Sequence, residues 1–563
     1  MYANVVVLTY QSPDIDSYTY EIPKILQSRI KVGQLVSVPF GKRNPIGLVI
    51  STVNQKSTTI GNIKPIISII STNPILLPFQ IELLKWLSSY YHAPMVNCLK
   101  ALLPPTPKRL YEAQQTVYRP QSITQTLVIV PNINSIPQAL AKFKQAKNYA
   151  IYHSELKNSE KFEVWQKIIS GNADYVFGSR LSIFAPCPKL SKIIIYDEHE
   201  GAYKDERSPY FDTLTVAEKI SELTKCKLQI IDSSPKITTY FNHRQNIQIP
   251  KISTKVQIVS MLTEKAAGNS SPISDILETY IKRGSEKNKK ILLFLNKKSD
   301  SGHVYCRNCK YSEFANTRPE TCPECHSTEI FFNSLNVKSL AILVQKIVPE
   351  AKINLLSENR LQSTVYSLPS IDIATAAVFY KLSPKKYDLA AHIRTDSALN
   401  INDFTSQEKL FAQITNLKKL AKGLVLLQTY NPEHLVLQTV TKNNYLDFYN
   451  KHLEERKMLS YPPFSLLIKL SIKGKIEDLT EAKAQKLYEK LSLQSAVYGL
   501  QSTSLGPYKS HFTKRNLKYN IILKVKINDY SLATRENAIK NLKPVLEKVP
   551  RDVQITQEPS NLS

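Results

Sequence analysis

The chain has 563 residues, 42% of them hydrophobic, and its 74 Lys and Arg exceed its 47 Asp and Glu to give a formal net charge of +27. No apolar run approaches the length of a membrane span and the first residues lack the basic start of a secretory signal, so we expect a cytoplasmic protein with no membrane partner. The length predicts three or four domains. The charge favours a nucleic-acid partner, although a Lys-rich, low-GC proteome would explain part of the excess.

Residues 1 to about 60 hold short apolar runs separated by turn signals, which predict a small β-barrel-like domain or a curled sheet. Two of these runs, 35–38 and 46–50, flank a turn that carries Phe40, Lys42 and Arg43. An aromatic and basic turn is suited to meet a sugar-phosphate backbone, and it is equally typical of a solvated hairpin tip.

The first domain ends in a proline-rich stretch, Leu102–Pro107, after a helix predicted over Gln80–Tyr91. From Thr126 onward, apolar runs alternate with helical segments, and this pattern predicts a parallel α/β sheet. The runs cover 127–130, 149–152, 175–177, 193–196 and 228–231, and helices are predicted at 137–145 and 159–170.

A second alternating series begins at Ile291 and continues to Leu427. Two α/β units of this kind are typical of the paired lobes of a helicase. The remainder, 441–563, predicts a smaller α+β domain with a helix around 478–491 and strands at 466–472 and 521–525.

Four of the seven cysteines form two CxxC pairs, Cys306 with Cys309 and Cys322 with Cys325, twelve residues apart. Each pair can present two thiolates from a tight turn, and the two pairs together close a tetrahedral Zn²⁺ site. Because protein ligands fill all four positions, the spacing predicts a structural zinc ribbon that holds one ion.

Glycine is scarce, with 14 residues, and the sequence contains neither GxxxxGK[ST] nor GxGxxG. A loop that cradles phosphates needs glycine so that backbone N–H groups can approach the anion. We therefore expect neither ATP nor Mg²⁺ as a cofactor.

Five segments carry a resemblance to a known family: Val36–Gly47, Leu102–Pro105, Gly178–Pro186, Leu427–His434 and Glu455–Phe464. In this order they resemble segments of the PriA family, the replication-restart helicases of bacteria. The resemblance covers most of the chain. It implies a first domain that binds the 3′ end of a nascent strand, two helicase lobes, a zinc module inserted in the second lobe, and a C-terminal domain.

The resemblance breaks where the family binds ATP. About twenty glycine-free residues separate Pro105 from Leu127, which leaves no room for a P-loop or a winged helix. The family's Asp-Glu-Glu-His motif falls on residues 196–199, where Tyr196 replaces the first acid, and the family's two terminal arginines become lysines. Lys lacks the planar fork that stabilises a transferring phosphoryl group. The predicted ATPase remnants are Asp197, Glu198, His199, Lys419 and Lys422.

The zinc segment also departs from the family, which carries four CxxC pairs and two ions, so one ion is expected here. Each candidate for contact with nucleic acid is a basic, aromatic or hydroxyl side chain, and taken singly such a residue is more often a solvated surface group than a ligand. The candidates are Phe40, Lys42, Arg43, Ser179, Arg180, Lys509, Lys514, Arg515 and Lys518.

The predicted domains follow the resemblance. They are a 3′-DNA-end-binding-like domain at 1–105, a linker at 106–126, degenerate helicase lobes at 127–260 and 261–440, a zinc ribbon at 303–328 inserted in the second lobe, and a C-terminal DNA-binding-like domain at 441–563.

We expect a non-enzymatic, monomeric protein of replication restart that binds forked or single-stranded DNA at stalled forks. It would recruit primosome and replicative-helicase-loading proteins. Two alternatives stay open: an active ATP-dependent 3′–5′ DNA helicase with an unrecognised nucleotide site, and a zinc-stabilised RNA-binding protein.

Overall fold

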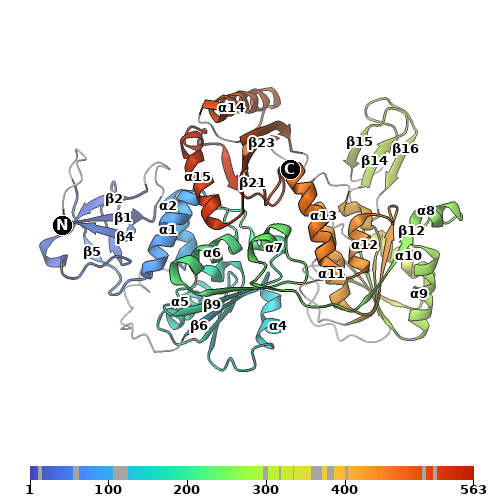
Figure 1. Ribbon diagram of the computed structural model, residues 1–563, viewed down its shortest axis with the longest axis horizontal. Coiled ribbons are helices and arrows are strands. Elements are labelled where there is room, and N and C mark those ends of the chain that lie inside the picture. The colour runs from blue at the N-terminus through green and yellow to red at the C-terminus, as the bar shows by residue number, and fades with distance from the viewer. Residues whose placement is uncertain are drawn as a thin grey trace. The chain divides into compact units, whose positions relative to one another are not determined.

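The structure is a computed structural model (Figure 1). It describes residues 1–9, 16–54, 63–104, 124–295, 302–315, 319–333, 335–356, 370–376, 379, 386–399, 403–497, 502–510 and 517–562. The chain forms two compact units, Met1–Ile249 with Leu453–Ser563, and Pro250–His452. Within the described ranges, no helix is both long and apolar enough to cross a membrane.

The first unit begins with a five-stranded antiparallel sheet in the order β2-β1-β4-β3-β5. Alternate side chains of β1 enter different cores: Val5 and Val7 pack with Tyr20, whereas Val6 packs with residues of the following helices. The elements are β1 Tyr2–Val7, β2 Tyr18–Glu21, β3 Leu35–Ser37, β4 Ile46–Val53, β5 Ser68–Ile69, α1 Pro78–Tyr90 and α2 Met95–Leu102.

This sheet curls, because Glu21 at the end of β2 exchanges backbone hydrogen bonds of 3.0 Å with residues 64 and 66, just before β5. A curled sheet was one of the two forms expected from the sequence. A closed barrel stays a prediction.

A six-stranded, all-parallel sheet follows, in the order β11-β10-β9-β6-β8-β7. Both faces are apolar, with Val128 and Phe177 in one core and Leu127 and Ile193 in another. The strands are β6 Gln125–Ile129, β7 Tyr149–Tyr152, β8 Tyr175–Gly178, β9 Leu190–Tyr196, β10 Lys227–Ile231 and β11 Ile247–Gln248. The helices are α4 Ile136–Leu140, α5 Asn158–Ile169, α6 Thr213–Thr224 and α7 Ile237–His243.

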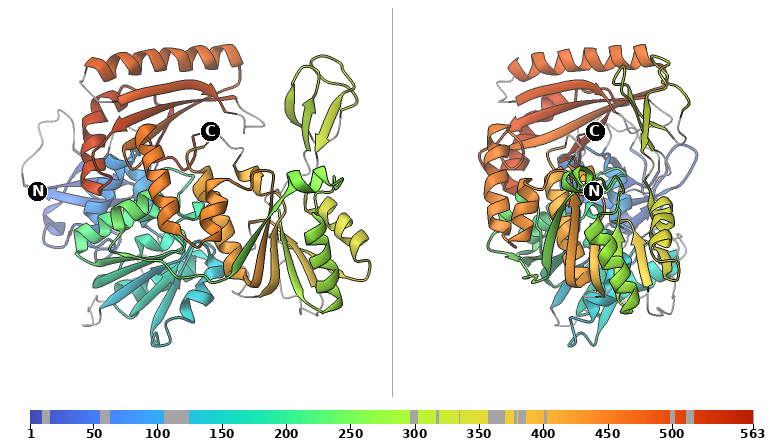
Figure 2. Two further views of the ribbon diagram at one scale, coloured as in Figure 1. Left: turned by 45° about the vertical axis from the view of Figure 1, so that its right-hand side comes forward. Right: turned by 90° about the vertical axis from the view of Figure 1, so that its right-hand side faces the viewer.

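The C-terminal part of this unit is a four-stranded antiparallel sheet in the order β22-β23-β21-β24, with α14 along one face (Figure 2). Its elements are β21 Ser465–Gly474, α14 Glu477–Val497, β22 Ser502–Lys509, β23 Leu517–Lys526, α15 Leu532–Leu546 and β24 Gln554–Gln557. The helix α13, Tyr445–Met458, precedes them.

A buried ionic group ties the parts of the first unit together. The Arg535 guanidinium of α15 binds Glu218 of α6 and lies 2.6 Å from Glu558, which follows β24. The Tyr90 hydroxyl of α1 donates to the same Glu558 carboxylate at 3.1 Å. Burial opposes ionisation, but Arg535 and Lys204 lower the pKa of Glu558, so these pairs hold the helices of three sheets in one core.

The second unit contains another six-stranded parallel sheet, in the order β12-β20-β19-β13-β18-β17. The two alternating series of the sequence are thus two parallel α/β sheets. The strands are β12 Lys255–Ser260, β13 Lys290–Phe294, β17 Lys352–Leu356, β18 Ser370–Ala374, β19 Tyr387–His392 and β20 Ala421–Thr429. The helices are α8 Met261–Ala266, α9 Asp275–Glu286, α10 Val337–Ile347, α11 Ser406–Leu420 and α12 Leu435–Thr441.

Two element boundaries differ from the sequence expectation. The strand β12 precedes the boundary expected at 260–261, yet it pairs with β20 in the second sheet, and its Val259 side chain packs in that core. The helix α4 ends at Leu140 rather than at 145, since the next residues form reverse turns, such as Phe143 N–H to Leu140 O at 2.9 Å.

A three-stranded sheet in the order β15-β14-β16 is inserted between β13 and α10. Its core is small, with Val304, Cys306, Cys322 and Ile330 as its buried members. The strands are β14 Gly302–Cys306, β15 Ser312–Ala315 and β16 Ile330–Asn333.

Candidate nucleic-acid interface and metal centre

The aromatic and basic turn of the first domain is an exposed hairpin tip. Phe40 N–H donates to Arg43 O at 2.8 Å and Arg43 N–H returns a bond of 3.1 Å. Gly41 has a φ of +61°, the left-handed region that glycine adopts without strain, and this closes the turn. The Phe40 ring packs edge-on to Tyr18 at 5.2 Å, while Lys42 and Arg43 point into solvent. The tip therefore offers two cations beside a fixed aromatic ring.

Arg180 is engaged within its own part of the chain. Its Nη1 donates to the carbonyls of Ala202 and Lys204, both at 2.8 Å, and its Nε lies 3.3 Å from the Asp205 carboxylate. Its neighbour Ser179 is buried. These contacts hold the loop after β9, so Arg180 and Ser179 support the fold directly, and a role in DNA contact stays a prediction.

The remnant predicted at 197–199 lies where β9 and β10 end. His199 Nδ1 is 2.8 Å from Asp232 Oδ1, its Nε2 is 3.0 Å from Glu200, and its backbone N–H donates to Asp232 Oδ2 at 2.9 Å. Burial opposes protonation, but the two carboxylates raise the pKa of His199 to about 10. The two carboxylates therefore favour the protonated form of the buried imidazole.

The ligand atoms of Asp197, His199 and Asp232 lie within 4.8 Å of one another, which is close enough for a shared metal ion. A metal needs the neutral imidazole, whereas this arrangement stabilises imidazolium. The neighbouring Glu198 is 2% exposed and pairs with Lys236 at 2.9 Å. Burial raises the pKa of Glu198 and Lys236 opposes that shift. The group is a set of paired charges at the carboxyl edge of the sheet.

Lys419 and Lys422 lie at the amino edge of the second sheet, where its parallel strands begin. Lys419 is in the last turn of α11. Lys422 is the second residue of β20, at the amino end of that strand. The Lys422 ammonium pairs with Asp388 at 3.1 Å. Since the strands are parallel, both lysines are on the side opposite to the carboxyl ends of β13 and β19.

Two of the four C-terminal candidates are described, Lys509 on the outer strand β22 and Lys518 on its neighbour β23. Lys509 is exposed and pairs with Glu477 at 2.6 Å. Lys518 is half-buried in β23, directly opposite Lys473 of β21. Lys514 and Arg515 lie outside the described residues.

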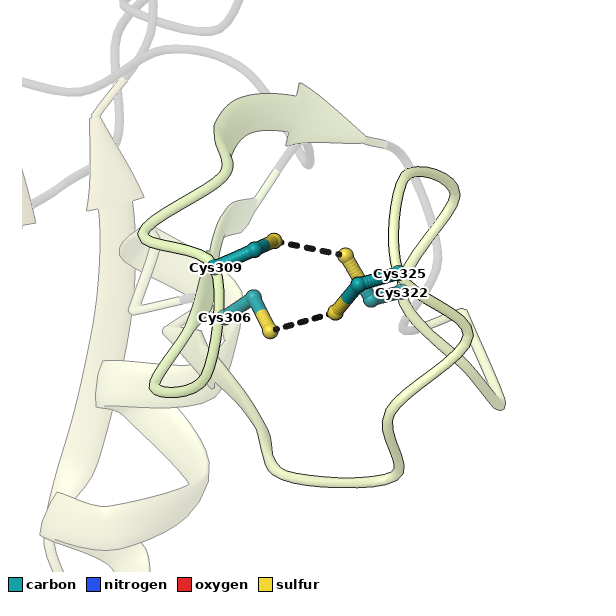
Figure 3. A group of neighbouring side chains, drawn as sticks. All are labelled: Cys306, Cys309, Cys322 and Cys325. Atoms are coloured by element: carbon teal, nitrogen blue, oxygen red, sulfur yellow. Dashed lines mark hydrogen bonds between the residues drawn. The ribbon is translucent and has the colours of Figure 1, made fainter.

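The four cysteines converge, as Figure 3 shows. Cys306 Sγ lies 3.6 Å from Cys325 Sγ, and Cys309 Sγ lies 3.5 Å from Cys322 Sγ. A tetrahedral ion with Zn–S bonds of about 2.3 Å places its sulfurs about 3.8 Å apart. Both separations are far longer than a disulfide bond of about 2.05 Å. The residues present therefore fit one Zn²⁺, held by Cys306, Cys309, Cys322 and Cys325.

Two of the sulfurs differ in how readily they form thiolate, which is the form that binds metal. A backbone hydrogen bond from Tyr311 favours the thiolate of Cys309, but burial and the neighbouring thiols raise its pKa to about 12. The Ser327 backbone N–H and neighbouring thiols lower the pKa of Cys325 to about 6. The Asn308 side-chain amide approaches the same sulfur at 3.7 Å. A thiolate with N–H donors needs less proton release to accept Zn²⁺.

Sequence reasoning missed the partners of His199. Asp232 follows the apolar run 228–231 just as Asp197 follows the run 193–196. Since neighbouring parallel strands end at one edge, two acids in these positions are expected to lie close together, and this signal was present in the sequence. The four-residue spacing of Glu200 from Tyr196 carried no comparable signal.

Residues 6–104 match the family model described as PriA_3primeBD, the 3′DNA-binding domain. The matched region contains the first sheet apart from the start of β1, together with the hairpin tip, α1 and α2.

The chain is also similar over most of its length to curated proteins named Replication restart protein PriA. That of Synechocystis is 28% identical over 64% of this chain and 50% of its own length. That of Bacillus subtilis is 28% identical over 76% and 59%, and that of Treponema pallidum is 22% identical over 89% and 91%. The chain thus spans about half the length of the first two relatives. The solved structure of RecG bound to a three-way DNA junction aligns with a TM-score of 0.35 and 11% identity over 68% of this chain and 47% of its own, a score too low to carry an argument.

These relatives correct one expectation. The prediction that the chain is not an enzyme, and that its helicase lobes are degenerate, is wrong. The relatives belong to the PriA family, whose members the sequence analysis identified as helicases, and neither the fold nor the comparisons show a loss of motifs. The error arose because missing sequence patterns were treated as missing function. The chain is a relative of the replication restart proteins PriA.

Proposed function

We propose that the chain binds DNA at abandoned replication forks through a free 3′ end and an adjoining single-stranded segment. The match of residues 6–104 to a 3′DNA-binding domain carries this proposal. The exposed Lys42 and Arg43 beside the fixed Phe40 ring support it, because a DNA end offers phosphates for cations and a base for an aromatic ring. Once bound, the protein would recruit primosome and replicative-helicase-loading proteins.

Fluorescence anisotropy with labelled oligonucleotides tests the hairpin tip. Lys42→Ala/Arg43→Ala removes two exposed cations, so we expect affinity for a 3′-ended single strand to fall roughly tenfold and the salt dependence to lose up to two phosphate contacts. Lys24→Ala/Arg29→Ala is the matched control, since it removes the same charge from exposed positions of the same domain. Equal losses in both variants would mean that the effect is only net charge.

A second candidate function is ATP-driven strand separation, favoured by the PriA relatives and by the two parallel sheets. Hydrolysis of ATP in the presence of forked DNA tests it. We expect DNA-stimulated turnover that Glu198→Gln abolishes and that Glu206→Gln, an exposed acid in the next loop, leaves intact. Absence of turnover would remove this candidate and leave DNA binding untouched. Preference for single-stranded RNA over forked DNA would instead support the RNA-binding alternative.

A further inference from the structure

The two faces of the C-terminal sheet differ in chemistry. Along β21, Leu466, Ile468, Leu470 and Ile472 pack into one core with side chains of α14 and α15. Side chains alternate along a strand, so the residues between them point to the opposite face. Those residues are mostly polar, and their partners on β23 are directly opposite in register. We call this face the lysine face, and its members are Lys469, Ser471, Lys473, Lys518 and Asn520.

Two lysines of the lysine face are cross-strand neighbours. Lys473 of β21 and Lys518 of β23 occupy directly opposed positions, an arrangement in which like charges repel. Burial and the charge of Lys473 lower the pKa of Lys518. Within the described ranges, neither ammonium forms an ion pair with a carboxylate. An anion between the two ammonium groups would remove the repulsion.

Next to this pair is a polar group that lacks a partner. Asn520 is 0% exposed, and its Oδ1 accepts a 2.8 Å bond from the Ser471 hydroxyl. Its Nδ2 has no hydrogen-bond acceptor among the described residues. A buried donor without an acceptor is unfavourable, so this amide also indicates a missing acceptor on this face.

The inner part of the lysine face is already occupied by the chain itself. The Lys469 ammonium donates to both the carbonyl and the side-chain oxygen of Asn561, each at 3.0 Å. The hydroxyl of Tyr508, which is opposite Asn520 on β22, donates to the Leu562 carbonyl. Residues 561 and 562 thus supply oxygen acceptors to Lys469 and Tyr508. The oxygens of a bound sugar-phosphate backbone could accept from the same two donors.

We propose that the lysine face binds the backbone of single-stranded DNA, with a phosphate between Lys473 and Lys518, and that residues 561–562 compete with this strand for Lys469 and Tyr508. The proposal rests on the proposed function in that the ligand is DNA. Charge complementarity selects a polyanion. A sheet face that carries the aromatic ring of Tyr508 suits a single strand, whose bases are free to stack, better than a duplex.

Circular single-stranded DNA is the probe for the lysine face, since it has no 3′ end for the first domain to hold. We expect Lys473→Gln/Lys518→Gln to weaken its binding about three- to tenfold and to reduce the salt slope by about one to two. The control, Lys486→Gln/Lys540→Gln, removes the same charge from exposed helix positions and should leave the affinity within about twofold. The test variant removes a repulsion, so we expect it to fold, which circular dichroism checks.

A chain that ends at Ser560 tests the competition. Without residues 561 and 562, Lys469 and Tyr508 are available to DNA. We expect circular DNA to bind severalfold more tightly, because a larger fraction of the protein then has an unoccupied lysine face. Asn561→Gly should give a smaller gain of the same sign. Unchanged affinity in both variants would overturn the competition.

The outcomes separate this proposal from the proposed function. Normal binding of circular DNA by Lys473→Gln/Lys518→Gln, with 3′-ended DNA still bound, would overturn the lysine face alone. No binding of either DNA would overturn both. Capture of single-stranded RNA or of polyglutamate at the lysine face, with circular DNA not bound, would reject DNA as the ligand.

Discussion

Both large sheets are parallel, and each has a histidine near the carboxyl end of a strand. The pKa values of these two histidines are shifted in opposite directions. In the first sheet, His199 follows β9 and is held between Asp232 and Glu200, which raise its pKa to about 10 despite burial. In the second sheet, His392 ends β19 and is 0% exposed. Its ring packs edge-on to Phe294 at 4.8 Å, and burial lowers its pKa to about 4.

The two pKa shifts differ because the nearby aspartates have different hydrogen-bond partners. Asp232 follows the strand beside His199 and aims both oxygens at it. In the second unit, Asp396 is the corresponding acid, but its oxygens accept from the Thr429 hydroxyl at 2.6 Å and the Tyr430 amide at 2.9 Å. One edge therefore favours a protonated imidazole and the other an uncharged one, although both sheets are parallel.

The largest expected effect comes from breaking the charged edge. Asp232→Asn leaves the His199 cation buried without its main partner, so we expect the free energy of unfolding of the first unit to fall by about 3–5 kcal/mol. Tryptophan fluorescence in denaturant measures it, because Trp86 and Trp165 are the chain's two tryptophans and both belong to that unit. The double variant His199→Gln/Asp232→Asn removes both charges and should be less destabilised. Equal loss in both variants would show that the pair is not the source.

The pH dependence of the first unit should follow His199. The folded pKa of about 10 is above the ordinary value near 6.5, so the folded state holds the proton more tightly. Its stabilising contribution is complete below about pH 6.5 and is lost as the pH rises toward 10. Fluorescence-detected unfolding from pH 6.5 to 9.5 should show this decline, and His199→Gln should flatten it. A decline that persists in the variant would assign it to other groups.

The second unit should show the opposite trend, and a smaller one. His392 has a folded pKa of about 4, below its ordinary value, so the unfolded state takes up the proton first. Its stabilising contribution is complete above about pH 6.5 and is lost as the pH falls toward 4, on the order of 3 kcal/mol in total. Amide hydrogen exchange of β19 measures it, because both tryptophans are in the other unit. His392→Gln is the matched variant, and acid sensitivity that it retains would contradict the role of His392.

Removal of zinc should leave both sheets nearly unchanged. Among its described residues the inserted ribbon has a core of four buried side chains, two of them metal ligands, so we expect it to lack the apolar area to stay folded without the ion. We expect Cys309→Ser/Cys322→Ser to lose one Zn²⁺ per chain and the amide protection of 302–333. The unfolding of either sheet should shift by less than about 1 kcal/mol, as is usual for sites without shared contacts. A larger shift would mean that the ribbon supports the second sheet. Cys98→Ser, which changes a cysteine of α2 in the other unit, is the control for zinc content.

The sequence predicted the elements better than the partners. The apolar runs predicted both parallel sheets, because each buried strand is one continuous apolar segment of the sequence. The CxxC spacing predicted that the four cysteines lie close together. The partners of His199 and Arg535 come from strands and helices distant in the chain, and periodicity carries no information on which acid turns toward which base. Of the lysine face, the sequence predicted only Lys518 as a contact for nucleic acid. Lys473 was missed because it becomes the neighbour of Lys518 only through the register of β21 and β23.

The smallest expected effect concerns the amino edge of the second sheet. Lys422 pairs with Asp388 at 3.1 Å, but its side chain is 53% exposed, so water and salt screen the pair and Lys422→Ala should cost under about 1 kcal/mol. The position is at the start of β20, whereas His392 is at the end of β19, so the change should also leave any DNA-stimulated ATP turnover as it was. Hydrogen exchange of β20 and the ATP assay check the two statements, with Lys409→Ala, another exposed lysine paired to an acid, as control. A turnover lost in Lys422→Ala alone would place a working phosphate contact at the amino edge, which a parallel sheet with its polar groups at the carboxyl edge does not predict.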